Sequence, residues 1–502
     1  MSDNPSTGGR AAAVSWDDPF GGPINHRSPA VAPLLTALQG NIMREHGRRR
    51  AAHLLFVVRK GAAGAAREWI RTRAAGLVTS AAGQLRDDDA ARASPGAPRG
   101  LFASFLLSAA GYTALGIPEA LLPRDPRFRA GMKASRDYLF DPPLDRWEEP
   151  YRGELHGMLM LAHDDEAVLR EEVALREGEL GVFAEMRVIE RGAVLLNEYG
   201  EHAEHFGFVE GVSQPLMLDE DVARERDQRD GISVWDPSAS PHLVLDREPA
   251  PGGAVRYGSY LVFRKLEQDV RAFREMERSL AEALGLPSGE SERAGALIVG
   301  RFRDGTPLTS AFAPGTHSPV PNNFDYASDL EGVKCPFNAH IRKLNPRGDE
   351  ARNSPQRGRD LQIMAQERSH RIARRGIPYG EQRVKPGEER SPDELPEGGV
   401  GLLFMCYQRD ITEQFEHMQG VWANGRSTLR QPFSGTDPVA GQLSGRVTRR
   451  DQVWPRRWGS SSAGMVRMDL RDCVRLRGGE YFFAPSIPAL AEFPGNAGPR
   501  LP

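Results

Sequence analysis

Apolar runs of strand length, each followed by a segment of helical character, occur at two distant places in the chain. The first run is HLLFVVRK over residues 53–60, and a segment of helical composition follows over 63–75. The second run is SYLVFRK over residues 259–265. It precedes a charged segment over 267–284 whose apolar residues recur at the spacing of one helix face. The pattern predicts a strand and then a helix at both places.

A second pair of segments repeats this arrangement. Residues 157–162, GMLMLA, lead into a predicted helix over 165–176, and residues 401–406, GLLFMC, lead into a predicted helix over 410–418. The chain therefore contains two copies of a strand-helix, strand-helix unit, which is the pattern of an internal repeat. We predict an α+β protein of two ferredoxin-like halves, joined near residues 236–253.

Composition along the chain sets the predicted domain boundaries. Residues 1–30 are rich in Pro, Gly, Ser and Asp, which predicts a flexible N-terminal arm. We then expect an N-terminal ferredoxin-like domain over residues 31–240 and a C-terminal one over residues 241–495. A chain of 502 residues with 39% apolar and 26% charged residues has enough material for two such domains.

Composition also narrows the classes of function. The N-terminus has no basic segment followed by an apolar one, and no apolar stretch reaches about 18 residues, so we expect a cytoplasmic protein without a membrane span. A net charge of -3 argues against a general nucleic-acid binder. Cys335, Cys406 and Cys473 are too few and too scattered for a disulfide framework, and we expect buried thiols.

Candidate chemistry is concentrated in four segments. One of them is CPFNAHIRKLNPR over 335–347, where His340 stands between an apolar turn and a basic run. The other three are EHFGFVEGVSQP over 204–215, RIARRGIPYG over 371–380 and GGEYFFAPS over 478–486. In this order they resemble the signature segments of the dye-decolorizing (DyP-type) haem peroxidases. Further similar stretches lie at 39–48, 258–265 and 401–406.

The resemblance implies a pair of ferredoxin-like domains of the dimeric α+β barrel type, with haem b bound mainly by the C-terminal one. It identifies His340 as the axial ligand of the haem iron. A histidine in that role donates its other ring nitrogen to a carboxylate. Asp410, Glu413 and Glu416 lie on the predicted helix 410–418, and we favour Asp410 as the partner, although each could also be an ordinary solvent-facing charge.

Peroxide cleavage also needs a group that moves a proton and a cation that stabilises developing charge. The resemblance places Arg374 as the cation and Glu210 as the acid/base. The family carries an aspartate where this chain has Glu210, so the sequence departs from the pattern there. The carboxylate is kept, but its displacement by one methylene matters, because a shift of about 1 Å can slow an enzyme about a hundredfold.

Other residues of these segments are expected to contact the cofactor. Arg342, Arg347 and Arg371 could pair with the haem propionates, and Arg375 could face a propionate or solvent, although a solvated loop face would show the same basic run. The glycines of the 207–211 segment permit close approach of the backbone to a flat cofactor. We therefore expect contacts from Gly207, Phe208 and Gly211.

Several weaker candidates have a plainer explanation beside the functional one. His202 and His205 are spaced i, i+3, which is weak evidence for a second metal. Residues 402–405 could line the distal side of the cavity or belong to the core. Four aromatic residues could relay electrons to a surface substrate, but core packing accounts for them more simply; they are Tyr379, Tyr407, Trp422 and Tyr481.

Together these expectations describe a haem b peroxidase that uses hydrogen peroxide to form a ferryl intermediate and oxidises a small organic donor such as a dye or a phenol. One alternative is a DyP-like haem protein whose peroxidase chemistry is altered or weakened by Glu210. Another is a non-enzymatic haem carrier, sensor or cargo protein. The sequence leaves open the natural donor and the subunit number, including a homo-oligomer.

Overall fold

Strands from both predicted halves pair into one antiparallel sheet. The computed structural model describes residues 18–94, 99–250, 254–315, 319–356, 358–381, 390–429, 434–443 and 449–493. The strands of the main sheet are β1 (Arg50–Val58), β2 (Phe102–Leu107), β3 (Gly157–His163), β4 (Ala184–Ala193), β7 (Asp246–Glu248), β8 (Arg256–Gln268), β9 (Ala373–Arg374), β10 (Ile377–Tyr379), β11 (Gly401–Gln408) and β14 (Val474–Ala484). Two short hairpins stand apart, β5 (Leu195–Leu196) with β6 (His202–Ala203) and β12 (Val453–Pro455) with β13 (Met465–Arg467).

The first half has the strand and helix order of a ferredoxin-like unit. After β1 come α2 (Ala63–Trp69) and α4 (Ala81–Ala93), then β2 and β3, then α9 (Glu166–Leu180) and β4. Side by side, the strands run β2-β3-β1-β4. The strands predicted at 53–60 and 157–162 and the helices after them are confirmed. Strand β3 reads as an unbroken apolar run because six of its seven residues are buried.

The second half repeats the same order. Strand β8 is followed by α11 (Val270–Leu284), then β10 and β11, then the π-helix η8 (Ile411–Ala423) and β14, and the strands lie in the order β14-β8-β11-β10. Helix α11 begins three residues later than predicted. Gln268 is still in the strand, and the Asp269 side chain caps the helix by accepting a hydrogen bond from the backbone of Ala272.

The two halves close into a barrel. Strand β14 pairs with β2 at Phe483 and Leu107, and β10 pairs with β4 at Tyr379 and Gly192. Since β8 also pairs with β11, strands β1 to β4, β8, β10, β11 and β14 form a continuous ring. Gly192 permits the second junction, because a Cβ there would lie 2.5 Å from the side chain of Ile377. The expected α+β barrel of two ferredoxin-like units is confirmed.

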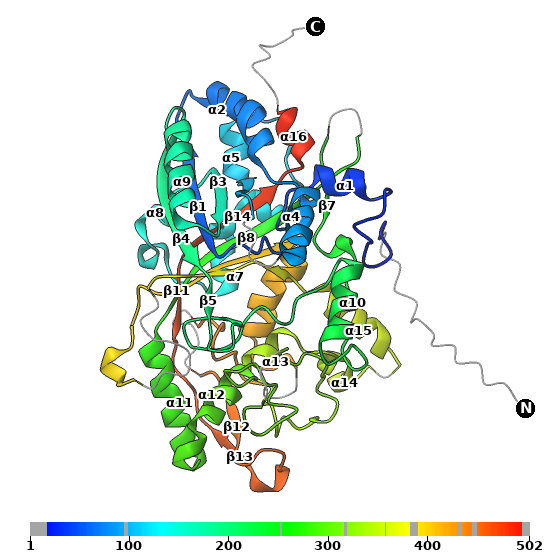
Figure 1. Ribbon diagram of the computed structural model, residues 1–502. Coiled ribbons are helices and arrows are strands. Elements are labelled where there is room, and N and C mark those ends of the chain that lie inside the picture. The colour runs from blue at the N-terminus through cyan, green and yellow to red at the C-terminus, as the bar shows by residue number, and fades with distance from the viewer. Residues whose placement is uncertain are drawn as a thin grey trace, which may run out of the picture.

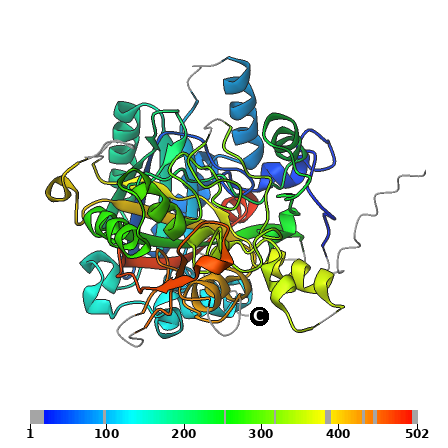
Figure 2. The same ribbon diagram turned by 90° about the horizontal axis from the view of Figure 1, so that it is seen from below.

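Apolar side chains gather in two clusters, one in the barrel and one beside it. Helix α9 packs against β1, β3 and β4. Helices α11 and α12 (Ser291–Val299) lie at the opposite end of the molecule, beyond the barrel (Figures 1 and 2). Their apolar faces pack with Phe206 and Phe208 into the second cluster. A pocket between the two clusters would be reached by residues from both halves.

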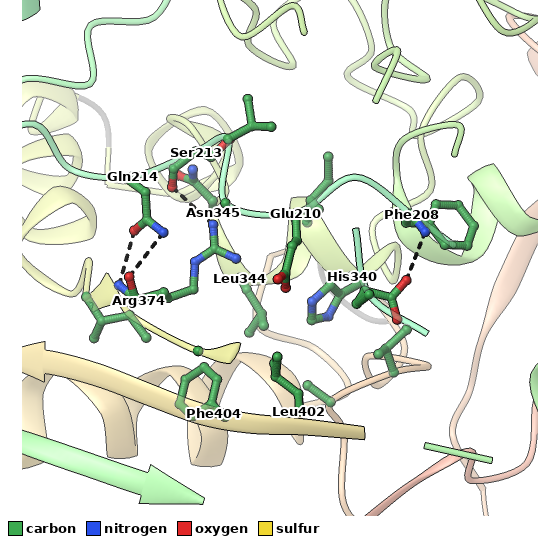
Figure 3. Close-up of a pocket in the computed structure, with 18 of the residues that line it drawn as sticks. Phe208, Glu210, Ser213, Gln214, His340, Leu344, Asn345, Arg374, Leu402 and Phe404 are labelled. Atoms are coloured by element: carbon green, nitrogen blue, oxygen red, sulfur yellow. Dashed lines mark hydrogen bonds between the residues drawn. The ribbon is translucent and has the colours of Figure 1, made fainter. Parts of the chain in front are cut away.

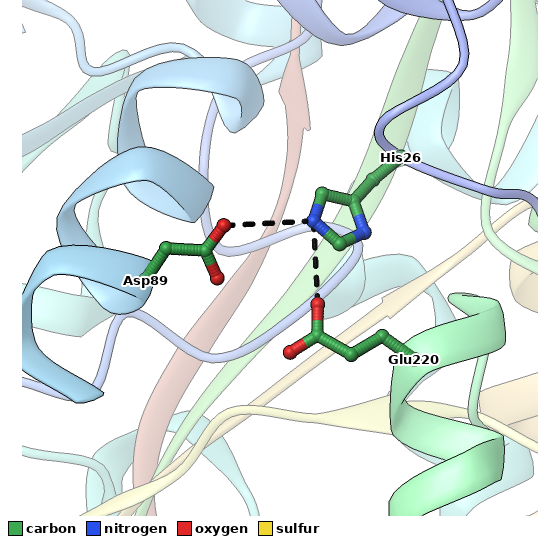
Figure 4. Close-up of side chains that lie close together, drawn as sticks. All are labelled: His26, Asp89 and Glu220. Atoms are coloured by element: carbon green, nitrogen blue, oxygen red, sulfur yellow. Dashed lines mark ion pairs between the residues drawn. The ribbon is translucent and has the colours of Figure 1, made fainter. Parts of the chain in front are cut away.

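Part of the segment predicted to be a flexible N-terminal arm is attached to the body of the protein. Residues 1–17 lie outside the described part of the chain, whereas residues 18–30 are attached to the body. Ile24 pairs with Leu218, and His26 lies between the carboxylates of Asp89 and Glu220 (Figure 4). The same carboxylates meet the guanidinium groups of four arginines, so this is a network of ion pairs; the arginines are Arg27, Arg44, Arg92 and Arg224.

The predicted domain boundary near residue 240 falls between β4 and β7. Because both halves share one sheet, this boundary stays a prediction. The predicted end of the C-terminal domain, residue 495, lies outside the described residues.

Cys335, Cys406 and Cys473 are buried and unbonded to one another, as predicted. None of the helices that the structure describes has the length and apolar character required to cross a membrane.

A buried ion pair joins the two halves. Arg264 of β8 donates to both carboxylate oxygens of Asp141, at 2.9 and 2.5 Å, and the two side chains are 2% and 0% exposed. Removing one partner leaves the other charge buried, so Asp141→Leu should lower the free energy of unfolding by about 3–5 kcal/mol. Urea denaturation measures this change.

A matched control is Glu68→Gln. Glu68 pairs with Arg71 on the surface, where the two side chains are 57% and 44% exposed, and such pairs contribute at most about 1 kcal/mol. Equal losses in the two variants would mean that Arg264 and Asp141 do not hold the halves together.

Candidate active site

A cavity of about 320 Å³ lies between the two apolar clusters. Its floor includes Leu266 of β8 together with Leu402 and Phe404 of β11 (Figure 3). Because successive residues of a strand point to opposite faces, Leu403 and Met405 instead belong to the barrel core. The first half contributes Glu45 and residues of the 202–215 segment, so both halves build the cavity.

His340 begins the short helix α13 (His340–Leu344) and lines the cavity. Its Nδ1 lies 2.8 Å from Oδ2 of Asp437, whose side chain is fully buried. Asp437 Oδ1 accepts hydrogen bonds from the backbone of Val439 and Ala440. Burial opposes its charge, but His340 and these two amides outweigh burial and lower the pKa of Asp437. A charged carboxylate thus fixes the proton on Nδ1 and leaves Nε2 free to act as a ligand.

The prediction that Asp410 is the partner of His340 is wrong. The Asp410 carboxylate caps η8 by accepting a hydrogen bond from the backbone of Glu413 at 2.8 Å. Glu416 is buried on the other side of that helix, where it accepts from the hydroxyl of Tyr481 and pairs with Arg127. Glu413 is exposed. The carboxylate that meets His340 comes from a loop 97 residues downstream.

Glu210 projects into the cavity from a loop held by a second carboxylate. Glu204 accepts hydrogen bonds from the backbone of Phe206 at 2.8 Å and of Phe208 at 2.9 Å, which fixes the turn leading to Glu210. Gly211 follows in a left-handed conformation, with φ of 77°. Burial, reinforced by the nearby charge of Glu204, raises the pKa of Glu210 to about 8, although Arg374 opposes this shift.

Arg374 lies on β9 and faces the same space (Figure 3). Gln214 holds its backbone: the amide of Arg374 donates to Gln214 Oε1 at 3.1 Å, and its carbonyl accepts from Nε2 at 3.3 Å. The guanidinium makes one long hydrogen bond, 3.4 Å, to the carbonyl of Ser213. Among the described residues its charge has no ion-pair partner, so its remaining N–H groups can serve a ligand in the cavity.

Three of the arginines predicted to contact the cofactor do line the cavity. Arg347 donates to the carbonyls of Asn322 and Phe324, and Arg375 donates to those of Asn41 and Ile42. Arg371, which was also predicted to pair with a propionate, lines the cavity too, and so does Arg301, which was not predicted; the partners of both are again neutral oxygens.

The prediction for Arg342 is wrong. Its guanidinium is fully buried away from the cavity, where it bonds Asp329 at 2.8 Å and Asp349 at 2.7 Å. Two carboxylates therefore already balance its charge. In the basic run that follows His340, successive side chains of the helix point in different directions and so meet different surroundings. The residue type alone does not predict which of them face the cavity.

Of the remaining predicted contacts, Phe208 and Gly211 line the cavity and Gly207 does not. Gly207 faces Arg274 and Arg303 instead. His202 lines the cavity, whereas Nε2 of His205 bonds the carbonyl of Tyr379. Neither histidine belongs to a group of three potential metal ligands in the described ranges.

The four aromatic residues considered as electron relays are all buried, which agrees with the simpler interpretation of them as core residues; they are Tyr379, Tyr407, Trp422 and Tyr481.

Asp437 and Arg301 belong to the site but were not predicted from the sequence. Asp437 lies in a Gly- and Pro-containing loop, and nothing in that loop's composition marks it as a partner of His340.

The comparisons with known proteins agree with this geometry. Residues 298–434 match the family described as "Dyp-type peroxidase, C-terminal". The chain is 41% identical over 464 residues to the multifunctional dye peroxidase DyP2 of Amycolatopsis sp., a match that covers 91% of this chain and 95% of DyP2. It is 31% identical to the dye-decolorizing peroxidase msp1 of Mycetinis scorodonius, covering 76% of this chain and 74% of that protein.

Solved structures show the same relationship. The DyP-type peroxidase AnaPX of Anabaena sp. superposes with a TM-score of 0.87 at 40% identity, over 94% of this chain and 97% of that one. The structure of Amycolatopsis DyP2 gives a TM-score of 0.86 at 39% identity, over 94% and 99% of the two chains. Identity at this level over nearly the whole length shows that the chain belongs to the DyP-type peroxidases, a family of haem b enzymes that reduce peroxide.

Proposed function

We propose that haem b binds in this cavity with His340 as its axial ligand, and that Glu210 and Arg374 act on the peroxide. One observation carries the proposal. His340 is polarised by a buried carboxylate and faces the same cavity as an acid/base candidate and an unpaired cation. These are the three functions that peroxide cleavage at a haem requires.

The charges of the cavity fit the cofactor. Arg301 and Arg347 are buried at its wall and Arg371 is half-buried there, and within the described ranges none of the three has a carboxylate partner. Burial lowers the pKa of Arg347 to about 9 and that of Arg301 to about 10, which shows how poorly their charges are compensated. The two propionates of haem b would supply the missing anions, while apolar floor residues such as Leu402 would contact its ring.

Bound haem b supplies the iron at which the O–O bond of peroxide is broken. The residues of this chain supply the rest. Glu210 takes a proton from the inner peroxide oxygen and delivers it to the outer one, so that water leaves. Arg374 donates hydrogen bonds to the oxygen that gains negative charge. Asp437 keeps Nδ1 of His340 protonated and raises the basicity of the coordinating nitrogen.

Several finer points remain predictions from the sequence. These are a small organic molecule as the electron donor and the cytoplasm as the location, while the number of subunits stays open, a homo-oligomer included. Nothing in the comparisons favours altered or weakened peroxidase chemistry.

Absorption spectroscopy tests the proposed function most directly. The haem-loaded protein should show a rapid spectral change on addition of hydrogen peroxide and should return to its starting spectrum when a phenol or dye is added. A haem carrier would show slow bleaching only, and that result would contradict the proposal.

Arg374→Leu tests the role of the cation. The variant should keep its haem but react with peroxide about a hundredfold more slowly or worse, the effect of losing one preorganised charge stabiliser. Stopped-flow absorption measures the rate.

The matched control is Arg368→Leu. Arg368 is also an arginine whose pKa is lowered by burial, but it packs over the ring of Trp235 and does not line the cavity. An Arg374→Leu protein that reacts as fast as this control would remove Arg374 from the reaction.

A further inference from the structure

Lys343 is buried beside the His340–Asp437 pair, and in the part of the chain that the structure describes it has no carboxylate of its own. It lies three residues after His340 on α13, so the two side chains point to the same side of the helix. Its Nζ donates to the carbonyl of Gly425 at 2.7 Å, to Oγ1 of Thr428 at 2.9 Å and to Oγ of Ser434 at 2.9 Å. These three bonds use all the donors of the ammonium group. No ion pair to Lys343 is found among the described residues.

All three acceptors belong to the segment that carries Asp437. Gly425 and Thr428 follow directly after η8, and Ser434 lies three residues before Asp437. The amide of Ser434 donates to the carbonyl of Arg426, which draws the two parts of the segment together. Lys343 therefore joins the helix of His340 to both parts of the segment that presents its carboxylate.

This arrangement is unfavourable for the lysine itself, because a buried ammonium without an anion loses its hydration. Burial accordingly lowers the pKa of Lys343 to about 7. A neutral residue would be easier to bury at this place. The hydrogen bonds that Lys343 makes explain its presence better than its charge does.

We propose that Lys343 is a positioning residue, which holds Gly425, Thr428 and Ser434 so that Asp437 stays bonded to Nδ1 of His340 and sets the strength of the bond from His340 to the haem iron. This inference rests on the proposed function, because it takes His340 to be the iron ligand. Removal of a partner that orients a metal ligand weakens metal binding about 10- to 100-fold, so a residue that acts through Asp437 should affect the same property.

The test is the iron–histidine stretching band of the reduced, haem-loaded protein, recorded by resonance Raman spectroscopy. Asp437→Asn provides the reference, since asparagine cannot polarise the imidazole as a carboxylate does, and its band should move to lower frequency. Lys343→Met should move the band in the same direction by at least about half as much. Lys343→Gln, which keeps a hydrogen-bond donor without the charge, should move it less. The double variant Lys343→Met/Asp437→Asn should match Asp437→Asn alone.

Three results would overturn the inference: an unchanged band in Lys343→Met, a shift to higher frequency, or equal shifts in Lys343→Met and Lys343→Gln. The last two results would mean that the charge of Lys343, and not its hydrogen bonds to the neighbouring segment, affects the iron–histidine bond. If Lys343→Met does not fold, Thr428→Val/Ser434→Ala removes two of the three acceptors from the other side and should shift the band in the same direction. An unshifted Asp437→Asn would instead reject His340 as the ligand, and the proposed function with it.

Discussion

His340→Ala is expected to give a folded protein that purifies almost without haem. Loss of an iron ligand should reduce haem affinity by more than the roughly 10- to 100-fold that follows from losing only a hydrogen-bond partner of a ligand. The fold should persist because the barrel core and the second apolar cluster are built from other residues. The haem content is read from the ratio of haem to protein absorbance, and the fold from circular dichroism.

His205→Ala is the matched control, since His205 belongs to the 202–215 segment but does not line the cavity, and its imidazole bonds the carbonyl of Tyr379. It should retain haem. If His340→Ala retained a full complement of haem with an unchanged axial-ligand spectrum, another residue would have to be the ligand.

Glu210→Gln should slow the reaction with peroxide about a thousandfold, within the range of roughly 10²–10⁴ attributed to general acid–base catalysis. Glutamine keeps the shape of the side chain but cannot accept a proton. Glu210→Asp should retain the rate or improve it, because aspartate keeps the proton chemistry and restores the shorter reach of the family. Stopped-flow absorption of the three proteins provides the comparison.

The pH dependence offers an independent check. The carboxylate form of Glu210 is the base, and burial raises its pKa to about 8, so the wild-type rate should rise as the pH increases through that region. Glu210→Gln should lack this rise. Equal rates and equal pH profiles for wild type and Glu210→Gln would show that the carboxylate takes no part in peroxide cleavage.

The sequence predicts the fold well where periodicity is strong. The strands at 53–60 and 259–265 were evident because nearly all of their residues are buried, which requires unbroken apolar runs. The helix after the second strand was evident because its one buried face requires apolar residues at regular intervals. The start of α11 was missed because Gln268 and Asp269 are polar, and which of them belongs to the strand depends on pairing with β14. Strand pairing between segments more than two hundred residues apart produces no periodic pattern in the sequence from which it could be predicted.

The site residues that belong to a sequence motif could be predicted. Those whose role depends on a contact formed only in the folded protein could not. His340, Glu210 and Arg374 stand in recognisable segments, and the structure brings them to one cavity. Asp437 and Arg342 show the limit. The first meets His340 only through the folding of a distant loop, and the second is balanced by two aspartates that residue type alone cannot assign to it.

The closed ring of strands has a consequence for the order of events during synthesis. Strands β1 to β4 are complete by residue 193 and can pair with one another as soon as they leave the ribosome. The ring closes only when β14, residues 474–484, arrives to pair with β8 and β2. The wall of the cavity includes Val474, the first residue of that strand. The cavity in which we propose that haem binds is therefore complete only after nearly the whole chain has been translated.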